Sequence, residues 1–189
     1  MPVAIDALPA IISLDDYGGN YSKYIDAIYD VFRNDFLVHR ARFGGKVIRM
    51  KFHPLINDRA YTFYHMTHKG DVETERIPDL RRCERVAWAR PAVEETQSLG
   101  LRFWEQTRNG SHRRICIWLD ADNGDNYYVI IEVRAEYILL WTAFYGDYPH
   151  AIRKKEAEYN EWKRTQDREY TPTDLVEKIM NELKSKNRQ

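Results

Sequence analysis

The stretch that most constrains this fold is residues 101–146, where four segments with the residue pattern of β-strands follow one another. Asn109-Gly110, a strong signal for a tight hairpin, separates the first two. Connections this short join antiparallel neighbours, so we predict an antiparallel meander of four or more strands. The last segment is apolar at nearly every position, which is typical of a central strand. The four segments are residues 101–108, 112–119, 127–134 and 137–145.

Helical patterns flank this sheet. Asn20 or Ser22 can cap a helix that ends near residue 36, and apolar side chains recur along that segment at helical spacing. We therefore predict an α+β fold in which N-terminal helices pack on the sheet and a pair of helices ends the chain. The other expected elements are strands over residues 46–53 and 58–68 and helices over residues 79–90, 149–166 and 173–186.

A chain of 189 residues with 43% hydrophobic residues can bury one core. We expect an irregular arm (residues 1–19), an α+β domain of catalytic type (residues 20–147) and a C-terminal helical appendage (residues 148–189). The longest apolar run, residues 138–145, is too short to cross a bilayer, and we expect no membrane partner. Cys83 and Cys116 lack metal-ligand spacing, so we interpret them as buried thiols of a cytoplasmic protein.

The formal net charge is zero, but the charges are unevenly distributed. Residues 35–119 carry sixteen basic and ten acidic side chains, so +6. A basic middle third with acidic neighbours fits a surface that binds a polyanion such as RNA. The alternative is ordinary solvated charge.

The densest group of chemically capable residues is the segment of residues 63–68, Phe-Tyr-His-Met-Thr-His. Histidine titrates near neutral pH, and RNA cleavage needs such a general base or acid. We therefore take His65 as the first catalytic candidate and His68 as an RNA-binding candidate. The alternative is that both are hydrogen-bonded structural residues.

Metal binding would use the same histidines, but the chain has no His-x-His pair and no His-Glu-x-x-His motif. Residues 120–125 resemble a calcium loop without its glycine at the sixth position and its acid at the twelfth. We interpret them as a hairpin loop. The sequence thus predicts no metal and no cofactor.

Three arginines on the predicted helix of residues 79–90 could hold phosphate. Arg81 and Arg85 are four residues apart and share a helix face, with Arg82 beside them. Guanidinium groups bind phosphate oxygens and stabilise charge on phosphorus. The alternative is that they pair with nearby carboxylates.

A strand face of alternating basic and aromatic residues could bind RNA, because such a face can stack bases and hold phosphates. The alternative is a packed tryptophan flanked by solvated arginines. The candidates are Arg102, Trp104 and Arg108, with Arg113 nearby.

The last strand ends in a further group, Trp141-Thr142-Ala143-Phe144-Tyr145. Thr142 places a hydroxyl group in an otherwise apolar strand, and this hydroxyl should have a hydrogen-bond partner. The Tyr145 phenol, at the strand end, could reach a site. Both residues could instead be core positions.

These features together resemble the barnase–EndoU–colicin–RelE group of metal-independent ribonucleases, most closely its phage-associated branch. The last strand of that branch ends in a Thr-Ala-Tyr-like triplet; here the triplet is Thr142-Ala143-Phe144, with Tyr145 one place later. Residues 63–84 also look like that branch, and the resemblance covers about residues 46–146. The resemblance implies a catalytic set of His65, Arg81 or Arg82, Thr142 and Tyr145.

Three functions follow as hypotheses. The first is a toxin- or phage-like ribonuclease that cleaves RNA by 2′-hydroxyl attack and has a protein antitoxin or inhibitor. The second is a non-catalytic RNA-binding module, and the third is an interaction protein of a mobile element.

Overall fold

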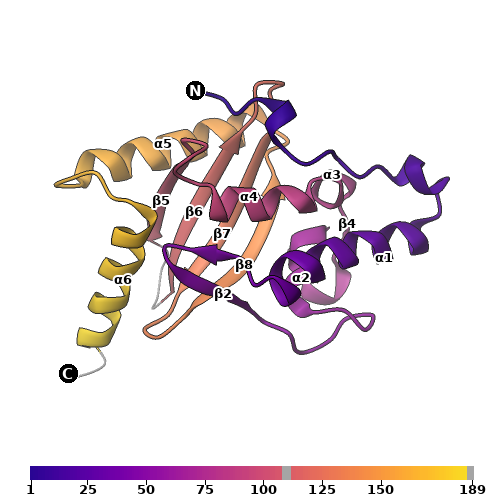
Figure 1. Ribbon diagram of the computed structural model, residues 1–189, viewed down its shortest axis with the longest axis horizontal. Coiled ribbons are helices and arrows are strands. Elements are labelled where there is room, and N and C mark those ends of the chain that lie inside the picture. Colours follow the sequence, from indigo (N-terminus) through magenta and orange to yellow (C-terminus); the bar gives the residue numbers. More distant parts are fainter. Residues whose placement is uncertain (108–111, 187–189) are drawn as a thin grey trace.

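A six-stranded sheet lies at the centre of the computed structural model, and the predicted meander supplies four of its strands (Figure 1). The structure describes residues 1–107 and 112–186, so the predicted Asn109-Gly110 turn lies outside the described residues. The strand order is β1-β2-β8-β7-β6-β5, with β3 and β4 paired separately. The strands are β1 (Arg42–Phe43), β2 (Lys46–Met50), β3 (His68–Lys69), β4 (Ile77–Pro78), β5 (Arg102–Thr107), β6 (Arg113–Asp120), β7 (Asn126–Val133) and β8 (Ile138–Tyr145).

The sheet is mixed rather than a pure antiparallel meander. β5, β6, β7 and β8 pair antiparallel in chain order, as predicted. β2 then joins as a parallel neighbour of β8, with Ile48 opposite Ile138. β8 is third in the order of six, which confirms the prediction that the apolar last strand is central or next to the centre.

The two faces of the sheet pack against different helices. Ile115, Ile117 and Val129 point into the larger core, on what we call the first face. Cys116, Trp118 and Tyr128 point into a smaller core on the second face. The alternation of side chains along β6 thus follows the sequence pattern. The helices are α1 (Tyr21–Phe32), α2 (Tyr61–Thr67), α3 (Leu80–Glu84), α4 (Ala89–Glu94), α5 (Pro149–Thr165) and α6 (Pro172–Lys186).

The first predicted helix is confirmed. The Asn20 side chain accepts a hydrogen bond from the Lys23 amide at 3.1 Å, which caps α1. Tyr24, Ile28 and Phe32 form its buried stripe. The helix continues as a π-helical turn, Arg33–Val38, before the chain enters β1.

The prediction of a strand over residues 58–68 is wrong, because most of this segment is helix α2. Its aromatic residues suit a strand, but Phe63 and Met66 are three apart and both buried. β2 pairs with β8 only as far as Leu140, and α2 packs against the rest of that edge. There the Thr62 hydroxyl donates to the Leu140 carbonyl at 3.4 Å. Tertiary packing therefore overrides the local strand preference.

The predicted helix of residues 79–90 is broken into pieces. α3 is capped by the Asp79 side chain and ends at Arg85, whose φ and ψ are −108° and 17°. A short 3₁₀ turn, Val86–Trp88, separates it from α4. Pro91 lies in the first turn of α4, where its missing N–H costs no hydrogen bond. Pro91 therefore lies at the start of a second helix.

Two C-terminal helices are present, as predicted, and they pack on opposite faces of the sheet. α6 buries Leu175, Val176 and Ile179 in the larger core. α5 packs Tyr159 and Trp162 against the smaller core of the second face. Both lie on the β5 side of the molecule (Figure 1). Among the described residues, no helix combines the length and apolarity that a membrane span requires.

Candidate functional site

His65 is held between a carboxylate and a guanidinium, and we call His65, Glu73 and Arg76 the His65 group. The imidazole Nε2 lies 3.0 Å from Glu73 Oε1, and Arg76 Nη1 lies 3.1 Å from Nδ1. A guanidinium nitrogen can only donate, so Nδ1 must accept. This assigns the neutral tautomer in which Nε2–H donates to Glu73. The imidazole is then oriented on both sides.

The surroundings of His65 favour the neutral imidazole. Burial lowers its pKa below 6.5, and the charge of Arg76 lowers it further, against the opposing effect of Glu73. The side chain is only 13% exposed. His65 is therefore uncharged at pH 7, the state that a general base requires.

Thr142 and Arg82 contact the backbone of His65 rather than its ring. The Thr142 hydroxyl donates to the His65 carbonyl at 2.8 Å, so the partner expected for this buried hydroxyl is present. Arg82 Nη1 donates to the carbonyls of His68 and His65, at 3.2 and 3.5 Å, and Arg82 pairs with Asp79. Both side chains thus fix the C-terminal end of α2.

A β-bulge in β8 places Trp141 beside His65. Ile130 pairs with Thr142 and Ile131 with Leu140, so Trp141 is the extra residue. Its side chain packs against the second-face core, with its ring centroid 6.3 Å from that of His65. The bulge therefore lets one strand present Trp141 on the second face and the Thr142 hydroxyl to α2.

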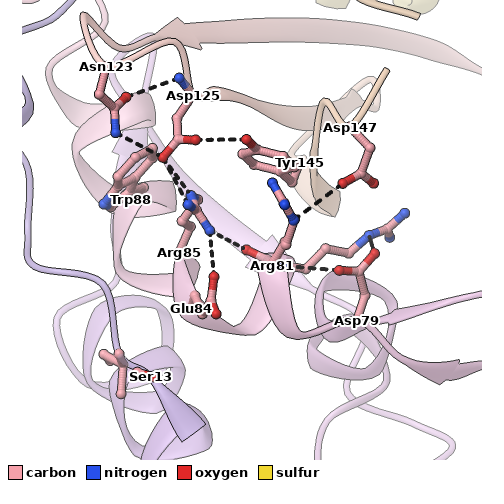
Figure 2. Close-up of polar contacts among 12 residues, drawn as sticks. Ser13, Asp79, Arg81, Glu84, Arg85, Trp88, Asn123, Asp125, Tyr145 and Asp147 are labelled. Atoms are coloured by element: carbon pink, nitrogen blue, oxygen red, sulfur yellow. Dashed lines mark hydrogen bonds and ion pairs between the residues drawn. The ribbon is translucent and has the colours of Figure 1, made fainter. Parts of the chain in front are cut away.

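Arg81, Arg85 and Tyr145 meet in a separate group around Asp125, which we call the Asp125 network (Figure 2). The Tyr145 hydroxyl donates to Asp125 Oδ1 at 2.7 Å, and Arg85 pairs with Asp125 Oδ2 at 2.8 Å. Arg81 and Arg85 both lie over the Tyr145 ring, at 5.0 and 4.6 Å from its centroid. Burial, followed by Asp125, raises the pKa of Tyr145. The phenol is therefore protonated and bound.

The five catalytic candidates thus fall into two groups. Tyr145 pairs with Tyr127, which belongs to the first-face core, whereas Trp141 beside His65 belongs to the second. The structure brings His65, Arg82 and Thr142 together, and it brings Arg81, Arg85 and Tyr145 together. The resemblance implied a single set, but the side chains of His65 and Tyr145 share no contact.

The part of the second face that α5 leaves uncovered is basic and aromatic, and we call it the basic face. Arg49, Leu139, Glu132 and Arg114 follow one another across β2, β8, β7 and β6. Glu132 is fully buried and pairs with Arg114 and Arg134. The basic face consists of Arg49, Lys51, Arg114 and Arg134, with the aromatic residues Tyr61, Tyr137 and Trp141.

Aromatic rings and cations alternate on the basic face. Arg49 lies 4.9 Å from the Tyr137 ring centroid, Lys51 lies 3.9 Å from that of Tyr61, and Arg114 lies 4.1 Å from that of Trp141. A small hollow lined by Lys51, Tyr61, His65 and Trp141 connects this face to the His65 group. Stacking surfaces, positive charge and a neutral imidazole therefore lie together.

The strand face predicted to bind RNA is covered at Trp104. α5 covers Trp104, which is 1% exposed and packs on Tyr159. Arg102 stacks on Trp118 and pairs with Asp120. The cause is tertiary, because a helix distant in sequence supplies the cover. Arg108 lies outside the described residues.

The other RNA-binding candidates are engaged within the protein. Arg113 pairs with Glu105 and Glu182, and the Arg85 side chain is only 8% exposed. The His68 ring lies against Tyr64, with centroids 4.4 Å apart. Burial, followed by Arg76, lowers the pKa of His68 to about 4. These residues therefore hold the fold together.

Sequence reasoning missed Glu73 and Arg76, which lie in a charged loop, and Arg49 and Lys51 on β2 and just beyond it. The polar positions of the predicted strand 46–53 alternate with apolar ones, which was a usable signal for Arg49 and Lys51. Nothing in the sequence pairs Arg76 with His65. That contact depends on how the β3–β4 hairpin folds back over α2.

No family model, curated protein or solved structure matches this chain. Within residues 1–107 and 112–186, no group of three or more His, Cys, Asp or Glu side chains could hold a metal ion.

Proposed function

We propose that this protein is a metal-independent endoribonuclease, toxin- or phage-like and cytoplasmic, that acts on RNA bound to the basic face. The observation that carries the proposal is the neutral imidazole of His65, oriented by Glu73 and Arg76 at the margin of this face. The resemblance of residues 46–146 to the barnase–EndoU–colicin–RelE group supports the same reaction. A ribonuclease of this kind would also require a protein inhibitor in the cell that makes it.

In the proposed reaction, the substrate phosphate draws Arg76 away from the imidazole and frees Nδ1. Nδ1 takes the proton of the 2′-hydroxyl, and the 2′-oxygen attacks phosphorus. Glu73 stabilises the imidazolium through Nε2–H, as the carboxylate of a catalytic triad does. The bond from phosphorus to the 5′-oxygen breaks, and the imidazolium returns its proton to that oxygen. The products are a 2′,3′-cyclic phosphate and a 5′-hydroxyl.

The roles of the remaining candidates follow from their contacts. Arg76 is the guanidinium nearest the imidazole, so it replaces Arg81 and Arg82 as the proposed phosphate ligand. Thr142 and Arg82 are positioning residues, because they contact the His65 carbonyl. Trp141 and Tyr61 would stack bases, and a sheet used in this way holds two or three unpaired bases.

The test is cleavage of single-stranded RNA at pH 7 in excess EDTA, with mass analysis of the product ends. His65→Gln should lower the rate by about 10²–10⁴-fold, the usual contribution of acid–base catalysis. His150→Gln, at an exposed histidine of α5, is the matched control and should keep the wild-type rate. Since a lowered pKa keeps the base neutral, the acid limb of the pH–rate profile should lie below pH 6.5.

Two outcomes would reject the ribonuclease: full activity of His65→Gln, or loss of activity in EDTA with recovery on adding Mg²⁺. The second candidate function is the non-catalytic RNA-binding module. The observation that favours it is that both ring nitrogens of His65 already have hydrogen-bond partners. RNA binding without cleavage by the folded protein would select that function.

A further inference from the structure

The two ring partners of His65 come from one loop, residues 70–76, which joins β3 to β4 and which we call the cap loop. Glu73 Oε1 lies 3.0 Å from Nε2 of the imidazole, and Arg76 Nη1 lies 3.1 Å from Nδ1. While both nitrogens are engaged, the imidazole has no free position from which to take a proton. The structure therefore shows the proposed base in a blocked state.

The cap loop is attached to the rest of the protein mainly through polar contacts. Residues 70–75 are exposed, and Arg76 is partly buried. Val72, an apolar residue of the loop, is 53% exposed and so adds little to the core. The β3–β4 hairpin from which the loop extends is two residue pairs long. A segment with so little buried apolar area can open locally without unfolding the domain.

The backbone of His65, by contrast, is fixed. The Thr142 hydroxyl and Arg82 both donate to its carbonyl. Its neighbours Tyr64 and Met66 are buried. If the cap loop moves, the imidazole therefore stays at the margin of the basic face.

The Tyr64 hydroxyl holds the cap loop at the two residues that contact the imidazole. It lies 3.1 Å from the Glu73 carbonyl oxygen and 3.4 Å from that of Arg76, so both carbonyls share its hydrogen. The Tyr64 ring is held separately, because it packs on His68 with the centroids 4.4 Å apart. The hydroxyl can therefore be removed without loss of that packing.

Gly70 allows the cap loop to close over the imidazole. Its φ is +140°, and a Cβ added to it would lie 3.3 Å from the Arg76 Cα. A side chain at this position would strain the backbone and crowd Arg76. Gly70 and Tyr64 therefore favour the same closed position by different means.

The closed position leaves one polar group of Arg76 unsatisfied. Nη1 contacts the imidazole and Nη2 donates to the His68 carbonyl, but within the described part of the chain the buried Nε–H has no hydrogen-bond partner. A buried donor without a partner is costly. A phosphate group offers several acceptor oxygens and can bind a guanidinium at two nitrogens at once. Phosphate should therefore compete well with the closed position for Arg76.

We propose that the cap loop is a latch on the His65 site, held closed by the Tyr64 hydroxyl and opened when a phosphate of bound RNA takes Arg76. Without RNA both imidazole nitrogens are blocked, and the substrate itself exposes the base. Tyr64 is thus a positioning residue, because it acts through Glu73 and Arg76. This regulation rests on the proposed ribonuclease, but the latch can be measured without RNA.

The first measurement is the reactivity of the His65 imidazole toward diethyl pyrocarbonate, which acylates a free nitrogen of a neutral imidazole. Mass spectrometry of proteolytic peptides gives the rate for each histidine, with the exposed His150 as an internal reference. We expect His65 to react slowly in the wild type. Inorganic phosphate should raise the His65 rate above that in sodium chloride of equal ionic strength.

Two variants and a control separate the latch from general loosening of the fold. Tyr64→Phe should raise the His65 acylation rate about fivefold, the effect of one hydrogen bond on an open–closed equilibrium. Gly70→Ala should raise the rate as well, because its Cβ opposes closure. Tyr170→Phe removes a 3.1 Å hydrogen bond to Asp167 in the α5–α6 loop and should leave the rate unchanged.

The second measurement is the pKa of His65 by NMR titration. Opening removes burial and the charge of Arg76, which lower this pKa, together with Glu73, which raises it. Lys51 stays beside the imidazole and continues to lower the pKa. Because the lowering influences are the larger, the pKa should rise toward 6.5 in Tyr64→Phe and stay at the wild-type value in Tyr170→Phe.

Binding of RNA supplies the third measurement. An RNA whose 2′-hydroxyls are replaced by fluorine should bind Tyr64→Phe about fivefold more tightly than the wild type, because a larger fraction of the variant is already open. The latch is overturned if Tyr64→Phe and Gly70→Ala both leave the acylation rate and the pKa of His65 unchanged, or if inorganic phosphate leaves the wild-type rate unchanged. If the imidazole responds as expected but the wild type neither binds nor cleaves RNA, the ribonuclease is rejected and the phosphate-operated latch stands.

Discussion

From the charges on the basic face we predict how steeply the affinity for RNA falls as the salt concentration rises. Among the described residues, Arg49 and Lys51 have no ion-pair partner, whereas Arg114 and Arg134 share the buried Glu132. The face thus offers about three net positive charges to phosphates. Each phosphate neutralised on a single strand adds about −0.7 to the slope of log affinity against log salt concentration. We expect a slope of about −2 for the wild type.

The perturbation is the double variant Arg49→Gln and Lys51→Gln, which removes two of these charges and leaves a slope of about −0.7. Over a fourfold rise in salt, from about 50 to about 200 mM, affinity should then fall roughly threefold in the variant and roughly twentyfold in the wild type. Both side chains are exposed, so the variant should fold normally.

The assay is fluorescence polarisation with a labelled single-stranded RNA whose 2′-hydroxyls are replaced by fluorine, which prevents cleavage. The double variant Arg153→Gln and Lys154→Gln on α5 is the control, because it makes the same charge change at exposed positions elsewhere. Its slope should stay near −2, because the charges removed from α5 act on RNA at the basic face only weakly and at long range. The reasoning is refuted if the first variant keeps the wild-type slope, or if the control flattens it equally.

Three further predictions concern stability. Thr142→Val removes the 2.8 Å hydrogen bond to the His65 carbonyl and should lower the free energy of unfolding by about 1–2 kcal/mol in urea titrations; an unchanged midpoint would contradict this. The pKa of His68 is about 4, below the unfolded value of about 6.5, so its contribution is fully present above pH 6.5 and is lost as pH falls through 4. The wild type should therefore lose roughly 1–3 kcal/mol more of its free energy of unfolding on acidification than His68→Gln does, a figure that is discounted for the partial exposure of His68. An unaltered pH profile of stability would refute this. Gly44→Ala should lower the melting temperature, because its Cβ would lie 2.7 Å from the Pro172 carbonyl at a φ of +54°, whereas Gly45→Ala meets open space and should cost only the backbone strain; equal losses would disprove the steric argument.

The meander could be predicted from the sequence because its information is local. Alternation along residues 112–119 separates Ile115 and Ile117 from Cys116 and Trp118, and the two sets do enter different cores. The short connections between strands then allow only antiparallel pairing. Asn20 and the apolar stripe after it likewise determine α1, since both cap and stripe lie within a few turns.

The sequence also singled out His65, Arg82 and Thr142, but it could not relate them correctly. Residues 58–68 have strand-forming side chains, and only the free edge of β8 beyond Leu140 makes a helix the better packing there. That change of element reorients His65 toward Glu73 and Arg76. The helix or strand propensity of a segment does not depend on a strand edge that is distant in the sequence, so propensity alone could not predict α2.

Tertiary structure alone decided which aromatic residues of the second face are covered and which are exposed. Trp104 and Trp141 both lie on the second face, and each is an aromatic residue within a strand. α5, which begins only after β8 ends, crosses the β5 half of that face and buries Trp104, while Trp141 stays partly exposed. The exposure of a strand residue depends on where a helix distant in sequence packs. Short-range sequence patterns determine only on which side of the strand the residue lies.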